Sequence, residues 1–299
     1  MPIAWKRRSC GSPAGSGASG TPVNRWSSSR VLRYRVLAAL VLIPLVVWSV
    51  LSLPSRLFAA ALGAFWLLAA WEWTRLLGWQ RALVRGAFLG LVAACLGWLF
   101  LQLEDASFSR MLYLVAAAWW GLAFAWLFRP QWGRGRTLPK MVAAFCVLLP
   151  AWFALSQLHM RPEDGPWLVL YVLALMWVAD SGAYFAGRAF GRHKLAPAVS
   201  PGKTWEGVAG GLLGVMLYAW GSGQWFGWQG GELAGFVVLA LFCASMSVVG
   251  DLFISLLKRQ QGLKDTGHLI PGHGGLLDRV DSLLAAAPLF ALGLGLLRL

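Results

Sequence analysis

The sequence predicts an all-α fold, a polytopic helical bundle that is integral to a membrane. Of its 299 residues, 58% are hydrophobic and only 13% are charged, whereas soluble proteins carry about 25% charged residues. The mean hydropathy is +0.62, and the 35 glycines and 19 tryptophans suit closely packed helices that meet lipid and its interfaces. These values exclude a disordered chain and a soluble globular enzyme.

Long apolar runs set the expected number of membrane spans. A hydrocarbon core of about 30 Å needs about 20 apolar residues in helical form. Nine stretches approach that length, so we predict about nine transmembrane helices. The predicted spans are 36–53, 57–71, 86–103, 111–128, 141–158, 166–187, 207–226, 233–257 and 282–297.

The basic residues between these runs predict the topology. With a cytoplasmic N-terminus, 22 of the 26 Lys and Arg residues fall on the cytoplasmic side and four fall outside, as the positive-inside rule requires. We therefore expect an extracytoplasmic C-terminus and a multi-pass membrane protein. The net charge of +14 then favours anionic lipid headgroups and phosphorylated substrates as partners, not nucleic acid.

Three parts of the chain are expected. Residues 1–35 are basic and rich in Gly, Ser and Pro, a composition typical of a disordered tail, here cytoplasmic. Residues 36–160 form the N-terminal transmembrane helices, and residues 161–299 form a C-terminal transmembrane catalytic region. Two cytoplasmic loops of that region, 180–206 and 251–281, hold six acidic residues and eight Lys or Arg residues. Such a mixture suits a metal ion together with a polyphosphate.

The eighth predicted helix indicates where charges converge. If it continues past the membrane, Asp251, Ser255 and Arg259 follow one another at i, i+4 and i+8, with Lys258 on the same face. Asp251 comes near the end of a strongly apolar span, where an ionisable group is costly unless it faces a partner or a polar cavity. This face therefore predicts a site and not a lipid contact.

A glycine-rich turn and two further carboxylates follow. Gly274 and Gly275 can bring backbone N–H groups close to an anion, and Asp278 and Asp281 lie three residues apart at the start of the ninth helix. Because Mg²⁺ favours one or two protein carboxylates completed by phosphate oxygens and water, Asp251 and Asp278 are the expected metal ligands.

Structural explanations compete with each of these assignments. Asp278 can be a helix N-cap, Lys258 and Arg259 can be interfacial cations, and the glycines can serve only a tight turn. Asp180, Tyr184 and Arg188, spaced four residues apart, form either an intrahelical ion pair with a tyrosine between or a wall of the substrate cavity. His273 either donates to a phosphate or has no catalytic role.

The C-terminal 120 or so residues resemble the phosphatidate cytidylyltransferase family, also called CDP-diacylglycerol synthases. The stretches Asp180–Arg192 and Ser200–Gly207 carry part of the likeness. The signature itself is matched by Ser255, Lys258, Arg259, Lys264, Asp265, Pro271, His273, Gly274, Gly275, Asp278, Arg279 and Asp281.

The resemblance implies transfer of the cytidylyl group of CTP to phosphatidate, which yields CDP-diacylglycerol and pyrophosphate for phospholipid biosynthesis. It implies Mg²⁺, with Mn²⁺ as a substitute, held by Asp251 and Asp278. The catalytic assignments are Asp251, Asp278, Lys258, Arg259, Lys264, Asp265, His273, Arg279 and Asp281. The substrate-binding assignments are Asp180, Tyr184, Arg188, Ser200, Lys203, Thr204, Ser255, Gly274 and Gly275.

Two other functions stay open at this point. A cytidylyltransferase for another phosphorylated lipid would use the same charged loops, since apolar side chains do not distinguish lipid tails. A transporter of an anionic solute would also bury charges, but it needs polar residues deep in several spans. The oligomeric state is undetermined, with a homodimer among the options.

Overall fold

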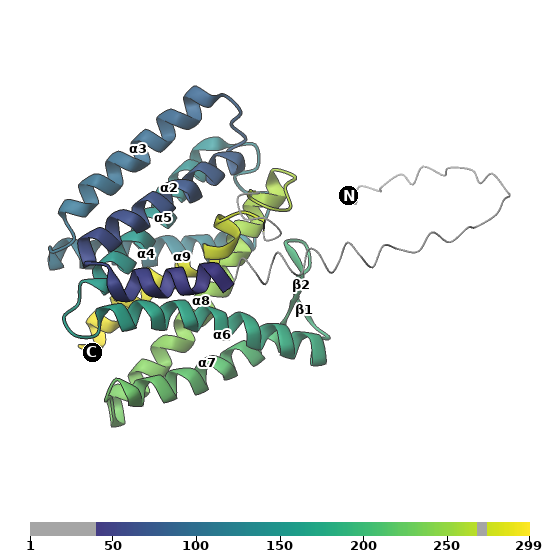
Figure 1. The fold of residues 1–299 in the computed structure, drawn as a ribbon. Coiled ribbons are helices and arrows are strands. Elements are labelled where there is room, and N and C mark those ends of the chain that lie inside the picture. Colours follow the sequence, from purple (N-terminus) through teal and green to yellow (C-terminus); the bar gives the residue numbers. More distant parts are fainter. Residues whose placement is uncertain (1–39, 268–273) are drawn as a thin grey trace.

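The computed structural model describes residues 40–267 and 274–299. The predicted tail, 1–35, lies outside the described residues. Within the described part, nine helices follow one another, one for each predicted span (Figure 1). They are Leu40–Ser52, α2 (Ser55–Leu76), α3 (Ala82–Leu101), α4 (Ala106–Leu127), α5 (Thr137–His159), α6 (Gly165–Phe190), α7 (Trp205–Trp225), α8 (Gly230–Gln260) and α9 (Leu277–Leu297).

Seven of the described helices are long and apolar enough to cross a membrane. The helix Leu40–Ser52 is shorter, and α7 is long enough but is interrupted by Gly, Ser and Gln residues that lower its hydropathy. An all-α membrane bundle is therefore confirmed. The number of spans and the sides on which the termini lie stay predictions.

Several helices run further than the apolar runs predicted. Helix α2 continues to Leu76, α6 continues to Phe190, and α9 begins at Leu277. Helix α8 has 31 residues, or about 46 Å at 1.5 Å per residue, so it exceeds a 30 Å core as expected. An apolar run shows where the contact with lipid ends, whereas the helix itself ends where its last backbone groups bond to partners outside the helix. The two predicted loops are correspondingly shorter than 180–206 and 251–281.

Among the described residues, the all-α prediction missed a small β-hairpin. Strands β1 (Lys194–Ala196) and β2 (Ser200–Thr204) pair antiparallel, with Lys194 opposite Thr204. The hairpin joins α6 to α7 at one end of the bundle, and the described C-terminus lies at the other end (Figure 1). Lys203 of the hairpin pairs with Asp251 of α8, so the described parts of the two charged segments, 180–206 and 251–281, meet at this end of the bundle.

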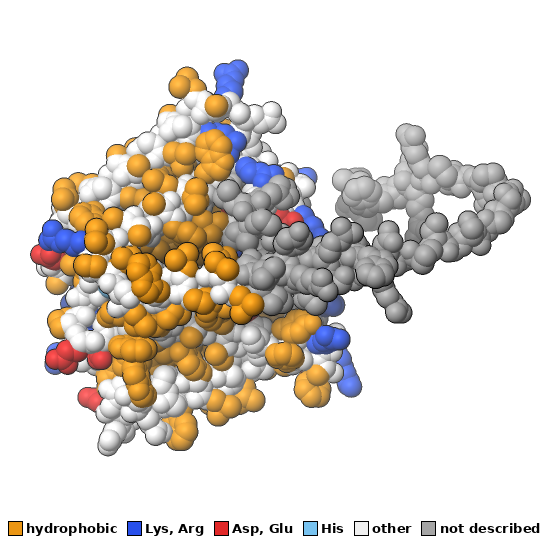
Figure 2. Space-filling model, in the orientation of Figure 1, with side chains coloured by type: hydrophobic (Ala, Val, Ile, Leu, Met, Phe, Trp, Pro, Cys, Tyr) orange, Lys and Arg blue, Asp and Glu red, His pale blue; other side chains and the backbone are white. Residues whose placement is uncertain are grey.

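The layers of the bundle differ in burial. Helices α5 and α9 have the largest buried share of the seven long helices and α3 the smallest, so the first two form the centre. Helix α9 packs against α8, α5 and α4, while α6 and α7 pack together at one side (Figure 1). Hydrophobic side chains cover the middle of the visible surface, and charged side chains gather toward its edges (Figure 2). This distribution suits a protein surrounded by lipid.

Glycines allow α6 and α7 to approach closely. A Cβ added at Gly211 of α7 would lie 2.7 Å from the Ala179 carbonyl oxygen, and one at Gly182 of α6 would lie 2.8 Å from the Gly210 carbonyl oxygen. Small residues permit such contacts between membrane helices. Any side chain at these positions would push the two helices apart and widen the space between them.

We predict that Gly211→Ala lowers stability by about 1–3 kcal/mol, the usual cost of overpacking. The matched control is Gly221→Ala on the same helix, where an added Cβ meets nothing within 4 Å. Alanine favours a helix over glycine by about 1 kcal/mol, so the control is expected to match or exceed the wild type. Thermal unfolding in detergent measures both, and equal midpoints for Gly211→Ala and wild type would contradict the prediction.

Candidate active site

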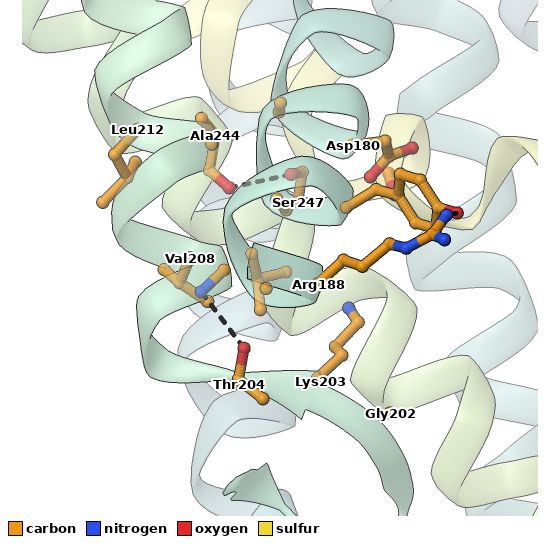
Figure 3. A pocket seen from close by; sticks show the side chains of 17 residues that line it. Asp180, Arg188, Gly202, Lys203, Thr204, Val208, Leu212, Ala244 and Ser247 are labelled. Carbon is orange, nitrogen blue, oxygen red and sulfur yellow. Dashed lines mark hydrogen bonds between the residues drawn. The ribbon is translucent and has the colours of Figure 1, made fainter. Parts of the chain in front are cut away.

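A cavity of about 360 Å³ opens between α6, α7, α8 and the hairpin. One wall is apolar, with Val208 and Leu212 of α7. The other wall carries Asp180, Arg188 and Lys203, whose charged ends lie on the side of the cavity opposite Val208 and Leu212 (Figure 3). The cavity therefore has an apolar half and a charged half, an arrangement that fits an amphiphilic anion.

An ion pair joins the hairpin to α8 beside this cavity. Lys203 Nζ lies 2.7 Å from Asp251 Oδ2, and both side chains are about one-quarter exposed, 25% and 27%. Ser255 Oγ donates to Asp251 Oδ1 at 3.2 Å, as the predicted i, i+4 spacing requires. The structure thus brings Lys203, assigned to substrate binding, onto the predicted metal ligand Asp251.

A second ion pair lies deeper. Lys258 Nζ lies 2.7 Å from Asp278 Oδ1, and the two side chains are only 11% and 8% exposed. Asp278 Oδ2 accepts from the backbone N–H groups of Thr266 at 2.8 Å and Gly275 at 3.1 Å. The N-cap of α9 is Leu276, which makes no side-chain cap bond, so the N-cap explanation of Asp278 is wrong. Lys258 is likewise buried rather than a snorkelling interfacial cation.

Two further carboxylates surround these pairs. Asp281 is buried in α9 and interacts electrostatically with Asp251, Lys258 and Lys203. Asp180 interacts with Asp251, Lys203 and Arg279. Four carboxylates and at least three cations from α6, the hairpin, α8 and α9 therefore share one region. Such a region can bind a cation and a phosphate at the same time.

The stripe on α6 lies at the cavity. Asp180, Tyr184 and Arg188 all line it, and Arg188 donates to Tyr184 Oη at 3.0 Å. Among residues 40–267 and 274–299, no ion pair joins Asp180 to Arg188. The placement favours the cavity wall over the intrahelical ion pair.

The remaining assigned residues lie around the rim. Arg259 is exposed and donates to the Val199 carbonyl at 3.4 Å, while Lys264 and Asp265 are exposed in the turn after α8. Ser200 is half-buried in β2. His273 lies outside the described residues, and the roles of all these residues stay predictions.

The glycines of the turn differ in what they do. Gly274 has φ +84°, a conformation that L side chains rarely adopt, and Gly275 donates its N–H to Asp278. A side chain at Gly275 would overlap the Thr266 hydroxyl. The backbone group that was expected to meet a substrate anion is therefore bound to a carboxylate of the chain itself.

The hairpin is fastened to the start of α7. Thr204 is the N-cap of α7 and its hydroxyl accepts from the Gly207 N–H at 3.1 Å. Glu206 Oε1 lies 2.6 Å from His193 Nδ1. Hydrogen bonds from the Glu206 backbone N–H and from the His193 side chain lower the pKa of the Glu206 carboxyl to about 2. These contacts hold Lys203, which precedes Thr204, beside Asp251.

Among the residues of this site that the sequence reasoning missed are Val208 and Leu212 of the apolar wall and Thr266 beside Asp278. Thr266 holds Asp278 through its backbone N–H, and no side-chain pattern could have indicated a bond made by the main chain. The sequence reasoning also missed the pairing of Lys203 with Asp251, because 48 residues separate them and only the hairpin brings them together.

The fold and the site define a polytopic membrane protein with a charged site at one end of its bundle. The model of the Cytidylyltransferase family matches residues 33–297. The phosphatidate cytidylyltransferase of Haemophilus influenzae is 40% identical over 288 residues, covering 87% of this chain and 98% of that protein. That of Pseudomonas aeruginosa is 42% identical over 266 residues, covering 87% and 96%. The chain belongs to the cytidylyltransferase family.

The two ion pairs differ in burial, and we predict that breaking the more buried pair lowers the stability of the protein more. Lys258→Met leaves the nearly buried Asp278 without its cation and is expected to cost about 3–5 kcal/mol. Lys203→Met leaves Asp251, which is partly solvated, without this cation and is expected to cost less than Lys258→Met. Denaturant unfolding in detergent measures both, and an equal loss of stability in the two variants would refute the distinction.

Proposed function

We propose that this protein transfers the cytidylyl group of CTP to phosphatidate, forming CDP-diacylglycerol and pyrophosphate. The chain belongs to the family, and the named relatives cover most of its length. The acceptor lipid carries a phosphate on two apolar chains. The observation that carries the proposal is the cavity with one apolar and one charged wall, beside two carboxylate–ammonium pairs.

We further propose Mg²⁺ as the cofactor, with Asp251 and Asp278 as its protein ligands. Carboxylate oxygens are the donors that Mg²⁺ prefers, and it completes its octahedron with phosphate oxygens and water. In the part of the chain that the structure describes, no group of three or more His, Cys, Asp and Glu residues could hold a metal ion. Asp251 is bonded to Lys203 and Ser255, and Asp278 to Lys258 and two backbone N–H groups, so a bound ion would take the place of one of these donors on each carboxylate.

The reaction needs little help from a base. The nucleophile is a phosphate monoester with a second pKa of about 6, so it is largely a dianion at neutral pH. An oxygen of the acceptor phosphate bonds to the α-phosphorus of CTP, and the bond from that phosphorus to the oxygen that links it to the β-phosphorus breaks, so that pyrophosphate leaves with that oxygen. When bound, Mg²⁺ neutralises charge on the phosphates.

The residues of the chain supply orientation and charge. Lys203 and Arg188 lie on the charged wall of the cavity and can hold the acceptor phosphate. Arg279 is exposed at the start of α9, where its charge can meet the departing pyrophosphate. The apolar wall receives the beginning of the lipid chains. Catalysis then rests on alignment and charge neutralisation.

The long apolar helices and the bacterial relatives indicate a multi-pass protein of the inner membrane. We propose that the site faces the cytoplasm, where CTP is found, and that the C-terminus is extracytoplasmic. The distribution of Lys and Arg supports this orientation. The hairpin and the described C-terminus lie at opposite ends of the bundle, as this topology requires (Figure 1).

We predict that Asp251→Asn and Asp278→Asn each lower CDP-diacylglycerol formation roughly a hundredfold or more, because each keeps the size of the ligand and removes its charge. The double variant is expected to be little worse than the worse single variant, since both ligands serve one site. Purified protein, labelled CTP, phosphatidate and a Mg²⁺ or Mn²⁺ titration provide the measurement.

Glu104→Gln is the matched control, because Glu104 is an exposed carboxylate, paired with Arg56 outside the site. It should leave activity unchanged. A fully active Asp278→Asn enzyme would overturn the metal assignment. If the wild type made no product with phosphatidate but made product with another phosphorylated lipid, that lipid would be the acceptor instead.

We predict that a cysteine at Gly202 reacts with an impermeant maleimide only from the cytoplasmic side. Gly202 is exposed in β2 and nothing lies within 4 Å of an added Cβ. A cysteine at Glu104 is expected to react only from the outside. Both are introduced after replacement of the four native cysteines. The reverse labelling pattern would show that the topology is inverted and that the site does not face the compartment that contains CTP.

A further inference from the structure

Glu72 is a buried carboxylate that the proposed chemistry does not use. It lies near the end of α2, is 1% exposed, and is followed by the fully buried Trp73. A buried charge without partners costs several kcal/mol. Its presence in an apolar helix therefore calls for donors from elsewhere in the chain.

Those donors come from the segment that leads into α9. Glu72 Oε2 accepts from Thr266 Oγ1 at 3.0 Å and from the backbone N–H of Leu277 at 2.8 Å. Leu277 is the first residue of α9, and a carboxylate is favourable at a helix N-terminus because the N–H groups there have no helical partner. One carboxylate of the N-terminal half thus fixes the start of α9.

Thr266 links Glu72 to the site. Its backbone N–H donates to Asp278 Oδ2 at 2.8 Å, its hydroxyl donates to Glu72, and its carbonyl accepts from Arg75 at 3.0 Å. Thr266 is fully buried, so none of these groups bonds to solvent instead. Two residues of α2 therefore hold the residue whose main chain holds Asp278.

Two glycines make room for this contact. A side chain at Gly267 would overlap the Glu72 carboxylate, and a side chain at Gly275 would overlap both Glu72 and Thr266. Neither glycine has a positive φ, so backbone conformation does not explain them. The space that they leave is filled by Glu72.

We propose that Glu72 is a positioning residue, which holds Asp278 in its working place through Thr266 and through the first turn of α9. The proposal rests on the proposed function, in which Asp278 is a metal ligand. Glu72 itself touches neither the cavity nor a substrate. Groups that orient metal ligands in this way typically contribute about 10- to 100-fold to metal affinity or activity.

The sequence itself contains an indication that Glu72 needs a partner. Glu72 is the acidic residue next to the predicted span 57–71, and it stands outside both charged loops. The predicted end of that span placed it in a loop, whereas the structure places it inside α2 and buries it. A carboxylate this close to an apolar span requires a partner.

The test compares Glu72→Ala and Glu72→Gln with Trp73→Phe as the matched control. Trp73 is also fully buried on α2, and its indole N–H donates to the Lys140 carbonyl of α5 at 3.1 Å. Two quantities are measured: the kinetics of CDP-diacylglycerol formation, and hydrogen–deuterium exchange at the Thr266 amide, whose partner is Asp278 and not Glu72.

For Glu72→Ala we expect kcat to fall about 10- to 100-fold, with a smaller change in the KM for phosphatidate, and Thr266 amide exchange to accelerate at least about tenfold. Glu72→Gln should recover much of both, because its amide oxygen accepts both hydrogen bonds. Trp73→Phe should lower thermal stability and leave both quantities near wild type.

If Glu72→Ala does not fold, Glu72→Gln and Thr266→Val carry the test, since the latter removes only the hydroxyl bond and should give an intermediate loss. Wild-type turnover and wild-type Thr266 exchange in Glu72→Ala would overturn the proposal. Equal losses in Trp73→Phe would also overturn it, because they would show a general packing role. A wild type inactive with CTP and phosphatidate would refute the proposed function, while Thr266 exchange would still decide the role of Glu72.

Discussion

The Asp278 carboxylate accepts hydrogen bonds from three segments, and the arrangement of the site depends on it. Lys258 comes from α8, Thr266 from the turn that follows, and Gly275 from the approach to α9. A carboxylate that is 8% exposed can stay charged only with such donors. The same bonds therefore stabilise the charge and fix the relative positions of the two helices that carry the predicted metal ligands.

Much of the fold was predictable from local sequence. Each predicted span corresponds to a described helix, because apolar runs of this length have few alternatives in lipid. The contact between Ser255 and Asp251 was predictable too, because it repeats a helical spacing. The pairs Lys203–Asp251 and Glu72–Thr266 were not, since they join residues far apart in the chain. A bond from the Thr266 main chain carries no side-chain signature at all.

The cavity lies where the contact between α6 and α7 changes from close glycine packing to charged side chains near the hairpin. Helices α6 and α7 approach closely at Gly182 and Gly211, and Gly211 itself lines the cavity. Toward the hairpin the same helices carry Arg188 and receive Lys203 from β2. The cavity thus presents an apolar surface and a charged surface, which match the two parts of the proposed lipid substrate.

The bond between Glu72 and α9 also bears on the order of synthesis. Glu72 precedes Thr266 by 194 residues and Leu277 by 205, and a chain is made and inserted from its N-terminal end. During that interval the Glu72 carboxylate lacks the donors that Thr266 and Leu277 supply. The full set of hydrogen bonds that holds Glu72 and Asp278 in place can therefore form only after α9 has been made, and a nascent chain that ends before Leu277 lacks it.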